Sequence, residues 1–207
     1  MGTSPSLDQF RDEAALGPVS VSFPPPRSPR PGPVTVVVLT GRPACAVASG
    51  LAADLFDLAA SAFAGPPWHE TAEHARGLTD RMLADAEHVT FALSFAFTGD
   101  GPGLAGFSYG VRRRPTPGSP ADHLVSSRGE PFEFCELAVR PAARGRGAGR
   151  ALHDAVLAAS GPQPRWLITH PAARPAVSLY QASGWRTRRL VPSMTDGSPR
   201  MLMTRSR

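Results

Sequence analysis

The residues best suited to chemistry form a short arginine and glycine loop, Arg144-Gly145-Arg146-Gly147-Ala148-Gly149. Glycine lets the backbone approach a ligand closely, and the first turn of a helix offers unpaired N–H groups that attract anions. Arg150, the next residue, falls in the first turn of the helix expected here. This combination predicts a binding site for a phosphate group.

Two common phosphate-binding motifs do not fit this loop. The Walker motif ends in glycine, lysine and then serine or threonine, and the chain contains no lysine. The dinucleotide motif G-x-G-x-x-G/A needs a small residue at its last position, where the two registers place Arg150 or Leu152. The pattern that fits is R/Q-x-x-G-x-G/A, formed by Arg144, Gly147 and Gly149.

The loop lies between an expected strand and an expected helix. Residues 132–139 are mostly apolar and end shortly before Pro141, which cannot donate to a sheet ladder. From about Ala148 the apolar side chains recur at helical spacing, and Gly161-Pro162 marks the end of the helix. The residues that would share its buried face are Leu152, Ala155, Val156 and Ala159. A strand–loop–helix unit therefore holds the predicted phosphate site.

A second pattern occurs further along the chain, where residues 176–185 read AVSLYQASGW. Together with the loop at 144–149, this segment resembles the GNAT superfamily of acyl-CoA N-acyltransferases, in which A-x-x-L-Y-x-x-x-G-F/W follows the loop that binds the coenzyme A pyrophosphate. The resemblance covers about residues 34–204. It implies an α/β fold with a mixed, mostly antiparallel central sheet, flanking helices, and fourth and fifth strands that splay apart.

Length and composition fit one domain with a tail. No apolar run among the 207 residues approaches the roughly 18 needed to span a bilayer, and the N-terminus lacks the apolar segment of a signal peptide. Two cysteines form neither a disulfide framework nor a metal cluster. We therefore expect a cytoplasmic protein with no membrane partner and no metal. The net charge of +5 is not interleaved with aromatic residues, which favours a polyanionic cofactor over nucleic acid.

The proline-dense residues 1–33 predict a disordered tail, and residues 34–207 predict the folded domain. Hydrophobic periodicity and Gly/Pro punctuation predict strands at 34–40, 89–97, 104–111, 132–139, 165–170, 185–191 and 200–204. Helices are expected at 49–62 with Ser49 as the N-cap, at 71–86, from about 148, and at 174–183. The loop 112–131 is long enough to serve as a flap on the acceptor side.

The resemblance also assigns the cofactor-binding residues. The exposed backbone of Leu137, Ala138 and Val139 would pair with the pantetheine amides of acetyl-CoA, as an added strand does. The N–H groups of the loop would bind the pyrophosphate, with added charge from Arg144 and Arg146. The whole set is Leu137, Ala138, Val139, Arg144, Gly145, Arg146, Gly147, Gly149 and Arg150.

The same resemblance places Tyr180 near the leaving sulfur. A phenol pKa of about 10 is close to about 8.5 for a thiol, so Tyr180 could protonate the thiolate. Glu136 is the candidate base because it alternates with Leu137 and Val139, which are expected to face the core; a water relay is the alternative. Glu133 would face the opposite side in an unbroken strand, and a bulge would change that.

Other residues have a chemical interpretation that their sequence context does not favour. His153 and His170 are isolated histidines, typical of structural positions, and Cys135 has no neighbouring base that would activate it. Trp68, between two expected helices, either shapes the acceptor pocket or covers the core. Ala173 stands where many members of the family have asparagine, which weakens one cofactor contact.

The expected reaction is transfer of an acetyl or similar acyl group from acyl-CoA to the primary amine of a small molecule or peptide. Two other functions fit the same sequence: a non-catalytic acyl-CoA sensor, and a regulator that binds nucleic acid through its basic surface. The acceptor, the acyl length and the oligomeric state, including a homodimer, stay open because acceptor pockets form from the least patterned segments.

Overall fold

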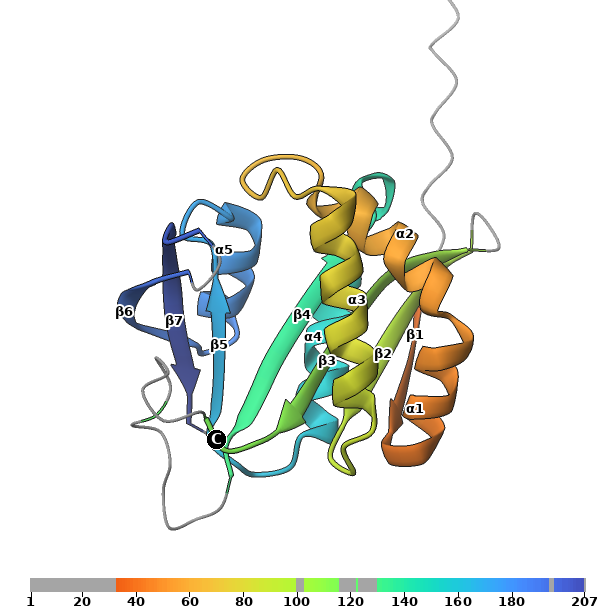
Figure 1. Cartoon of the computed structure of the whole chain (residues 1–207), viewed down its shortest axis with the longest axis horizontal. Helices are drawn as coiled ribbons and strands as arrows, with labels where there is room; N and C mark the ends of the chain where they lie inside the picture. The colour runs from red at the N-terminus through yellow and green to blue at the C-terminus, as the bar shows by residue number, and fades with distance from the viewer. Residues whose placement is uncertain (1–32, 100–102, 116–121, 123–129, 194–195, 207) are drawn as a thin grey trace, which may run out of the picture. The chain divides into compact units, whose positions relative to one another are not determined.

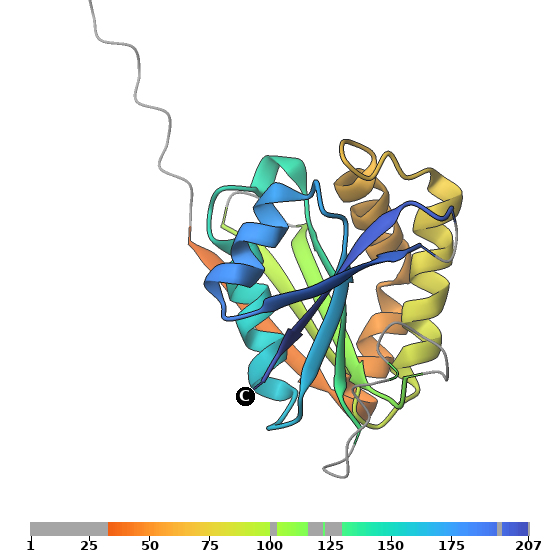
Figure 2. The same cartoon turned by 90° about the vertical axis from the view of Figure 1, so that its left-hand side faces the viewer.

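The computed structural model describes residues 33–99, 103–115, 122, 130–193 and 196–206. Of the expected tail only residue 33 lies within these ranges, and the expected acceptor flap falls largely outside them. Within the described ranges the chain forms a seven-stranded sheet with helices on both faces (Figures 1 and 2). This is the mixed α/β architecture that the sequence predicts.

The strands lie in the order β1-β2-β3-β4-β5-β7-β6 across the sheet (Figure 1). Their bounds are β1 Val34–Thr40, β2 Ala92–Thr98, β3 Leu104–Arg112, β4 Phe132–Val139, β5 Arg165–Thr169, β6 Arg186–Pro192 and β7 Pro199–Arg205. Neighbours are antiparallel except β4 and β5, which are parallel. The helices are α1 Gly41–Gly50, α2 Ala52–Phe63, α3 Ala72–Ala86, α4 Ala148–Ala159 and α5 Arg174–Ala182.

Different helices cover the two faces of the sheet (Figure 2). Helices α1, α2 and α3 pack on one face, here called the α3 face, over a core that includes Leu58, Met82 and Phe107. Helices α4 and α5 cover the other, the α4 face, where Phe134 and Val156 belong to a second buried cluster. The sheet is thus enclosed by apolar contacts on both sides.

Strand β2 shows how closely α4 approaches the sheet. Leu93 and Phe95 belong to the core of the α3 face, as the alternation of side chains along a strand requires. Between them, Ser94 faces α4 and its Oγ donates a hydrogen bond to the carbonyl oxygen of Leu152 at 3.2 Å. On β3, a Cβ at Gly106 would lie 2.7 Å from the nearest carbonyl oxygen of β4 and 2.9 Å from a Leu152 methyl group. Small residues here allow the tight packing of α4.

The segment after β1 differs from the expectation. Ser49 is not an N-cap, because α1 begins already at Gly41 and Ser49 lies in its last turn. Helix α2 begins at Ala52 after a bend of 77°. The sequence signal for α1 is weak because its buried positions, Ala44 and Ala48, are small and leave little hydrophobic periodicity. Among the described residues no single helix is long and apolar enough to cross a membrane; α1 and α2 meet that test only as a bent pair.

Strands β4 and β5 part after two residue pairs, Phe132 with Arg165 and Glu133 with Trp166. Strand β4 continues to Val139, while β5 pairs along its length with β7 on its other side. The predicted splay between the fourth and fifth strands is therefore confirmed. It leaves one edge of β4 without a neighbouring strand among the described residues.

A bulge interrupts β4 just beyond this parting. Tyr109 on β3 pairs with Glu136, but the next residue, Gly110, pairs with Phe134, so Cys135 is the extra residue. An extra residue shifts the alternation of side chains by one position. Glu133 and Glu136, which an unbroken strand would place on opposite faces, both contact side chains on the α3 face.

Candidate active site

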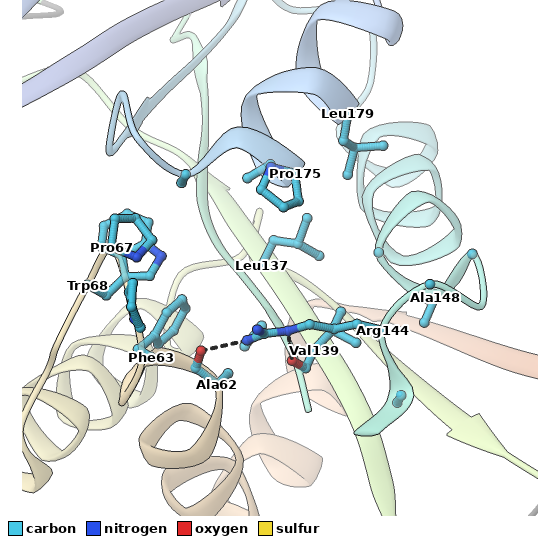
Figure 3. Close-up of a pocket in the computed structure, with 18 residues that line it drawn as sticks. Ala62, Phe63, Pro67, Trp68, Leu137, Val139, Arg144, Ala148, Pro175 and Leu179 are labelled. Carbon is cyan, nitrogen blue, oxygen red and sulfur yellow. Dashed lines mark hydrogen bonds between the residues drawn. The ribbon is translucent and has the colours of Figure 1, made fainter. Parts of the chain in front are cut away.

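A cavity of about 400 Å³ lies where β4 has parted from β5 (Figure 3). One wall is the end of β4 at residues 137–139, followed by the loop at 143–149. The opposite walls come from residues 62–68, at and after the end of α2, and from the start of α5 at residues 173–179. Most of the residues predicted for pantetheine and for phosphate therefore line one largely apolar cavity, whereas Arg146 and Arg150 lie outside its lining.

The phosphate loop reaches α4 through two glycines in the left-handed region. Gly145 has φ +76°, and Gly147, the N-cap of α4, has φ +83°, values that other residues rarely adopt. A Cβ on either glycine would meet no protein atom within 4 Å. No side chain caps α4, and the first N–H groups of a helix have no partner inside it. This geometry suits an anion at the start of α4.

Replacing Gly147 with valine should weaken acetyl-CoA binding by about 5–30-fold, because holding this one residue in the left-handed region then costs about 1–2 kcal/mol. The side chain would also enter the open space in front of the loop. The matched control is Gly161→Val, because Gly161 follows the other end of α4, has φ +78° and likewise meets no atom within 4 Å. Both variants should lose similar stability, and titration calorimetry should find normal affinity only in Gly161→Val. Equal affinities would overturn the loop assignment.

Arg144 joins the phosphate loop to helix α2. Its Nη2 donates a hydrogen bond to the carbonyl oxygen of Ala62 at 2.7 Å, and its Nε donates to the carbonyl oxygen of Val139 at 3.2 Å (Figure 3). These bonds hold two walls of the cavity together. Arg146 is half-buried and Arg150 is exposed. A contact from any of these arginines to a phosphate stays a prediction.

Tyr180 lies in a buried aromatic cluster next to the cavity-lining Leu179. Its ring centroid is 6.0 Å from those of Phe134 and His153 and 6.1 Å from that of Trp185. Burial raises the pKa of Tyr180 above its ordinary value, and the charge of Glu136 raises it further. The phenol therefore keeps its proton and can donate a hydrogen bond. Full proton transfer to a thiolate is less favourable than the reference pKa values suggest.

His153 connects two other side chains beneath Tyr180. Its Nδ1 lies 2.7 Å from Oδ1 of Asp154, and Nε1 of Trp185 donates a hydrogen bond to its Nε2 at 2.9 Å. Because an indole N–H only donates, Nε2 holds the lone pair and Nδ1 the proton. Burial lowers the pKa of His153, although Asp154 opposes this shift. A neutral imidazole with no exposed surface agrees with the structural role predicted for it.

The contribution of His153 to stability should be lost as the pH falls below about 6.5, the ordinary histidine pKa. In that range the unfolded chain binds a proton at this residue, whereas the lowered pKa of His153 delays protonation in the folded state. Urea unfolding of the wild type and of His153→Gln between about pH 7.5 and 5.5 measures the effect. The variant should be less stable at neutral pH and lose less on acidification; parallel curves would contradict this account.

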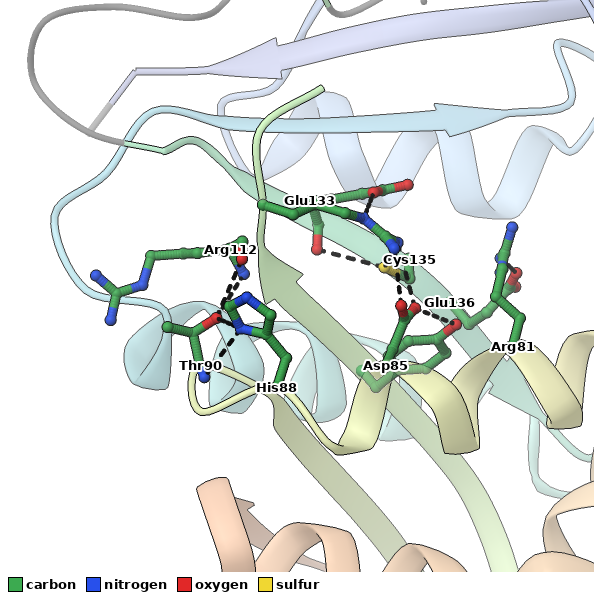
Figure 4. Close-up of polar contacts among 10 residues, drawn as sticks. Arg81, Asp85, His88, Thr90, Arg112, Glu133, Cys135 and Glu136 are labelled. Atoms are coloured by element: carbon green, nitrogen blue, oxygen red, sulfur yellow. Dashed lines mark hydrogen bonds and ion pairs between the residues drawn. The ribbon is translucent and has the colours of Figure 1, made fainter. Parts of the chain in front are cut away.

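Glu136 faces α3 because of the bulge at Cys135 (Figure 4). Its Oε1 accepts a hydrogen bond from Nη2 of Arg81 at 2.8 Å, and 20% of its side chain is exposed. Burial raises the pKa of Glu136 to about 7; Arg81 opposes this rise, while Glu70 and Glu133 add to it. A carboxylate with a pKa near the working pH is well suited to accept and release a proton.

A second polar cluster lies beside Glu136 (Figure 4). Arg113 donates hydrogen bonds to both carboxylate oxygens of Asp85 on α3, at 2.7 and 3.2 Å, and its Nε donates to Oε2 of Glu133 at 2.6 Å. The hydroxyl of Tyr109 donates to Asp85 at 3.5 Å. These partners are 20 to 28 residues apart, so no local spacing in the sequence could indicate them. The cluster ties the end of β3 to α3 on the face that carries Glu136.

The remaining candidate residues take mainly structural positions. Cys135 packs against the core of the α3 face, and burial raises the pKa of its thiol, which opposes a nucleophilic role. Nδ1 of His170 accepts a hydrogen bond from a backbone N–H two residues later at 3.0 Å. Trp68 both lines the cavity and packs edge-to-face on Phe63. Ala173 also lines the cavity. The part of the chain that the structure describes holds no group of three His, Cys, Asp or Glu residues that could bind a metal.

Solved structures of similar fold include three acetyltransferases. The histone acetyltransferase HPA2 and related acetyltransferase from Corynebacterium glutamicum is 21% identical, with a TM-score of 0.59 over 83% of this chain and 96% of that chain. The PaiA N-acetyltransferase from Thermoplasma acidophilum, solved with coenzyme A, is 13% identical, with a TM-score of 0.55 over 84% and 99%. The ribosomal-protein-S18-alanine N-acetyltransferase from Escherichia coli is 13% identical, with a TM-score of 0.53 over 83% and 93%.

At these identities the solved structures establish the fold alone. A comparison with curated protein sequences found no match. The model of the acetyltransferase (GNAT) family, in contrast, matches residues 53–185. Because this match covers more than half of the chain, the protein belongs to the acetyltransferase (GNAT) family, whose members are acyl-CoA-dependent N-acetyltransferases.

Proposed function

We propose that the protein transfers an acetyl group from acetyl-CoA to a primary amine by direct attack, with Glu136 as the base and Tyr180 as a hydrogen-bond donor to the departing sulfur. The placement of these two residues on β4 and α5, the elements on either side of the opening, carries the proposal. Glu136 directly precedes Leu137 and Tyr180 directly follows Leu179, and both leucines line the cavity. The electrostatic influence of Glu136 on the pKa of Tyr180 supports the proposal that both groups serve this opening, although neither belongs to the cavity lining itself.

In this proposal the cofactor occupies the cavity in two parts. The pantetheine arm lies along residues 137–139, where its amides pair with the free edge of β4. Because Arg144 already donates to the carbonyl oxygen of Val139, a pantetheine amide would share or displace that bond. The pyrophosphate lies at the start of α4, where the glycines at 145 and 147 leave open space. The net charge of +5 favours the approach of this polyanion.

The reaction follows from these positions. The amine nitrogen attacks the thioester carbon, and the carbonyl oxygen takes the π electrons and becomes an oxyanion. The excess proton of the amine passes to the Glu136 carboxylate. Collapse of the tetrahedral intermediate breaks the C–S bond and releases the coenzyme A thiolate. Because the pKa of Tyr180 is raised, its main contribution is a hydrogen bond to the departing sulfur. The thiolate, with an ordinary pKa of about 8.5, can complete its protonation from solvent.

The acceptor would be a small-molecule amine or the amine of a peptide. Peptides belong in the search because one solved structure of similar fold is named for acting on alanine of ribosomal protein S18. The amine would reach Glu136 from the α3 face, opposite the aromatic cluster around Tyr180. The two substrates would then meet at the opening between β4 and β5.

Release of free thiol from acetyl-CoA, measured over a panel of amines, tests the proposed function. The panel contains spermidine, kanamycin, free lysine and a peptide with an N-terminal alanine. Turnover with any of them supports the transferase. Binding of acetyl-CoA in calorimetry without turnover on an extended panel would favour an acyl-CoA sensor instead. Salt-sensitive DNA binding without acetyl-CoA affinity would favour a nucleic-acid regulator.

A further inference from the structure

The ion pair between Arg81 and Glu136 connects helix α3 to the proposed base. We propose that Arg81 is a positioning residue, which fixes the Glu136 side chain on the α3 face and increases the fraction of its carboxylate that is charged when the free enzyme meets its substrates. This inference rests on the proposed function of Glu136. Arg81 cannot itself accept the proton, because a guanidinium stays charged in proteins.

The contact has the geometry of a strong charged hydrogen bond. Nη2 of Arg81 lies 2.8 Å from Oε1 of Glu136 (Figure 4), within the range of charge-assisted N–H···O bonds. Arg81 is the more exposed partner, with 51% of its side chain accessible against 20% for Glu136. The bulge at Cys135 turns Glu136 toward α3, and Arg81 then holds the carboxylate from the solvent side.

Without Arg81, burial and the acidic groups around Glu136 would favour its protonated, neutral form. Burial raises the pKa of Glu136 most, and Glu70 and Glu133 raise it further, whereas Arg81 lowers it. The charged and titratable groups of the surrounding elements are Arg81 and Asp85 of α3, Glu70 before it, Tyr109 and Arg113 at the end of β3, Glu133 and Cys135 of β4, and Tyr180 of α5. Acidic groups dominate this set, so the cation that contacts Glu136 decides the charge of the carboxylate.

Neither of the neighbouring arginines can take the place of Arg81. Arg113 is bonded to Asp85 through its terminal nitrogens and to Glu133 through Nε. Arg200 of β7 lies over the ring of Trp68, 5.8 Å from its centroid, and interacts with Glu70. Removal of Arg81 would therefore leave Glu136 buried beside acidic groups without its charge partner.

The loss of Arg81 should raise the pKa of Glu136 by about one unit. A close opposite charge shifts a carboxyl pKa by about 1–3 units, and the exposure of Arg81 places the effect at the lower end. At pH 7 a smaller fraction of Glu136 would then be ionised, and a protonated carboxyl cannot accept the proton of the amine. Raising the pH would restore the charged form.

Carbon-13 NMR of the Glu136 carboxyl group in the ligand-free protein tests the proposal without any use of catalysis. The signal is assigned by its absence in Glu136→Gln. Arg81→Met should raise the titration midpoint by about one unit, Arg81→Gln by nearly as much because it removes the charge and keeps a donor, and Arg81→Lys by less than half a unit. The control Arg76→Met removes an arginine from the same helix, one that lies over the ring of Phe56, and should change nothing. An unchanged midpoint in both Arg81→Met and Arg81→Gln would overturn the proposal.

The pH dependence of kcat/KM, measured with the panel amine that has the highest turnover, gives the second test. The acid limb should move up by the same unit in Arg81→Met, which lowers the rate about fivefold at pH 7 and leaves it near wild type at about pH 9. An equal loss at every pH would indicate a merely structural role and overturn the proposal. If instead Glu136→Gln retains full activity while the NMR shift is found, the proposed base is wrong and the positioning of Glu136 by Arg81 stands.

Discussion

Glu136→Gln should lower the turnover number by about 10²–10⁴, the usual effect of losing a general base. The amide keeps the size of the side chain and can still accept a hydrogen bond from Arg81, but it cannot take a proton from the amine. Acetyl-CoA binding should persist because the loop at 144–149 and the backbone of residues 137–139 are unchanged. The acid limb of the wild-type pH profile reports the Glu136 pKa of about 7. The residual activity of the variant should show no such limb.

Glu133→Gln is the matched control for this experiment. Glu133 lies on the same strand and the same face, and it differs because its partner is Arg113 rather than Arg81. This variant should lose some stability with the ion pair to Arg113 and should retain the acid limb and most of the turnover. Full activity in Glu136→Gln together with a large loss in Glu133→Gln would transfer the role of base to Glu133.

Tyr180→Phe should lower turnover by about 10²–10³, the usual effect of losing one hydrogen-bond donor to developing charge, if its hydroxyl stabilises the departing sulfur. Phenylalanine preserves the ring that packs on Phe134, His153 and Trp185, so the aromatic cluster should stay intact. Acetyl-CoA affinity should also be unchanged, which separates an effect on chemistry from one on binding. The measurement is the turnover number at saturating acetyl-CoA, with the melting temperature and the affinity as controls.

A loss of turnover below about threefold in Tyr180→Phe, well under that scale, would assign Tyr180 to the core alone. Tyr180 does pack in the core, since only 6% of the residue is exposed. A loss in turnover with an equal loss in affinity would instead indicate that the hydroxyl holds the cofactor. In either case Glu136 would remain the proposed base, because the two variants test different steps.

Most of the fold can be predicted because its elements end at residues with a physical reason to end there. Pro141 closes β4, Gly147 with φ +83° is the N-cap of α4, and Thr71 accepts a hydrogen bond from the N–H of His74 at the start of α3. The same reasoning fails at α1, where small buried alanines replace the large apolar residues that mark a helix. It also starts β2 too early, since Val89 is 84% exposed and the strand begins at Ala92.

The site divides in the same way between local and distant interactions. The phosphate loop and the segment around Tyr180 are contiguous patterns, so the sequence suffices to find them. The partners of Glu136 are not: Arg81 is 55 residues away, and the bulge at Cys135 that turns both glutamates to one face has no signature in residue types. The consequence is that sequence predicts which residues are present at the opening, while their pKa values depend on pairings that appear only in the folded chain.

The early parting of β4 and β5 has a mechanical consequence. Hydrogen bonds link the two strands at one end only, yet the buried cluster of the α4 face runs without interruption from Phe134 on β4 to Leu167 on β5 and Trp185 beyond α5. Apolar packing thus joins the two strands on the α4 face, and Trp68 adds ring contacts to His170 and Arg200 across the parting. A molecule that enters the opening therefore separates only side chains, because no strand pairing links β4 and β5 beyond Glu133.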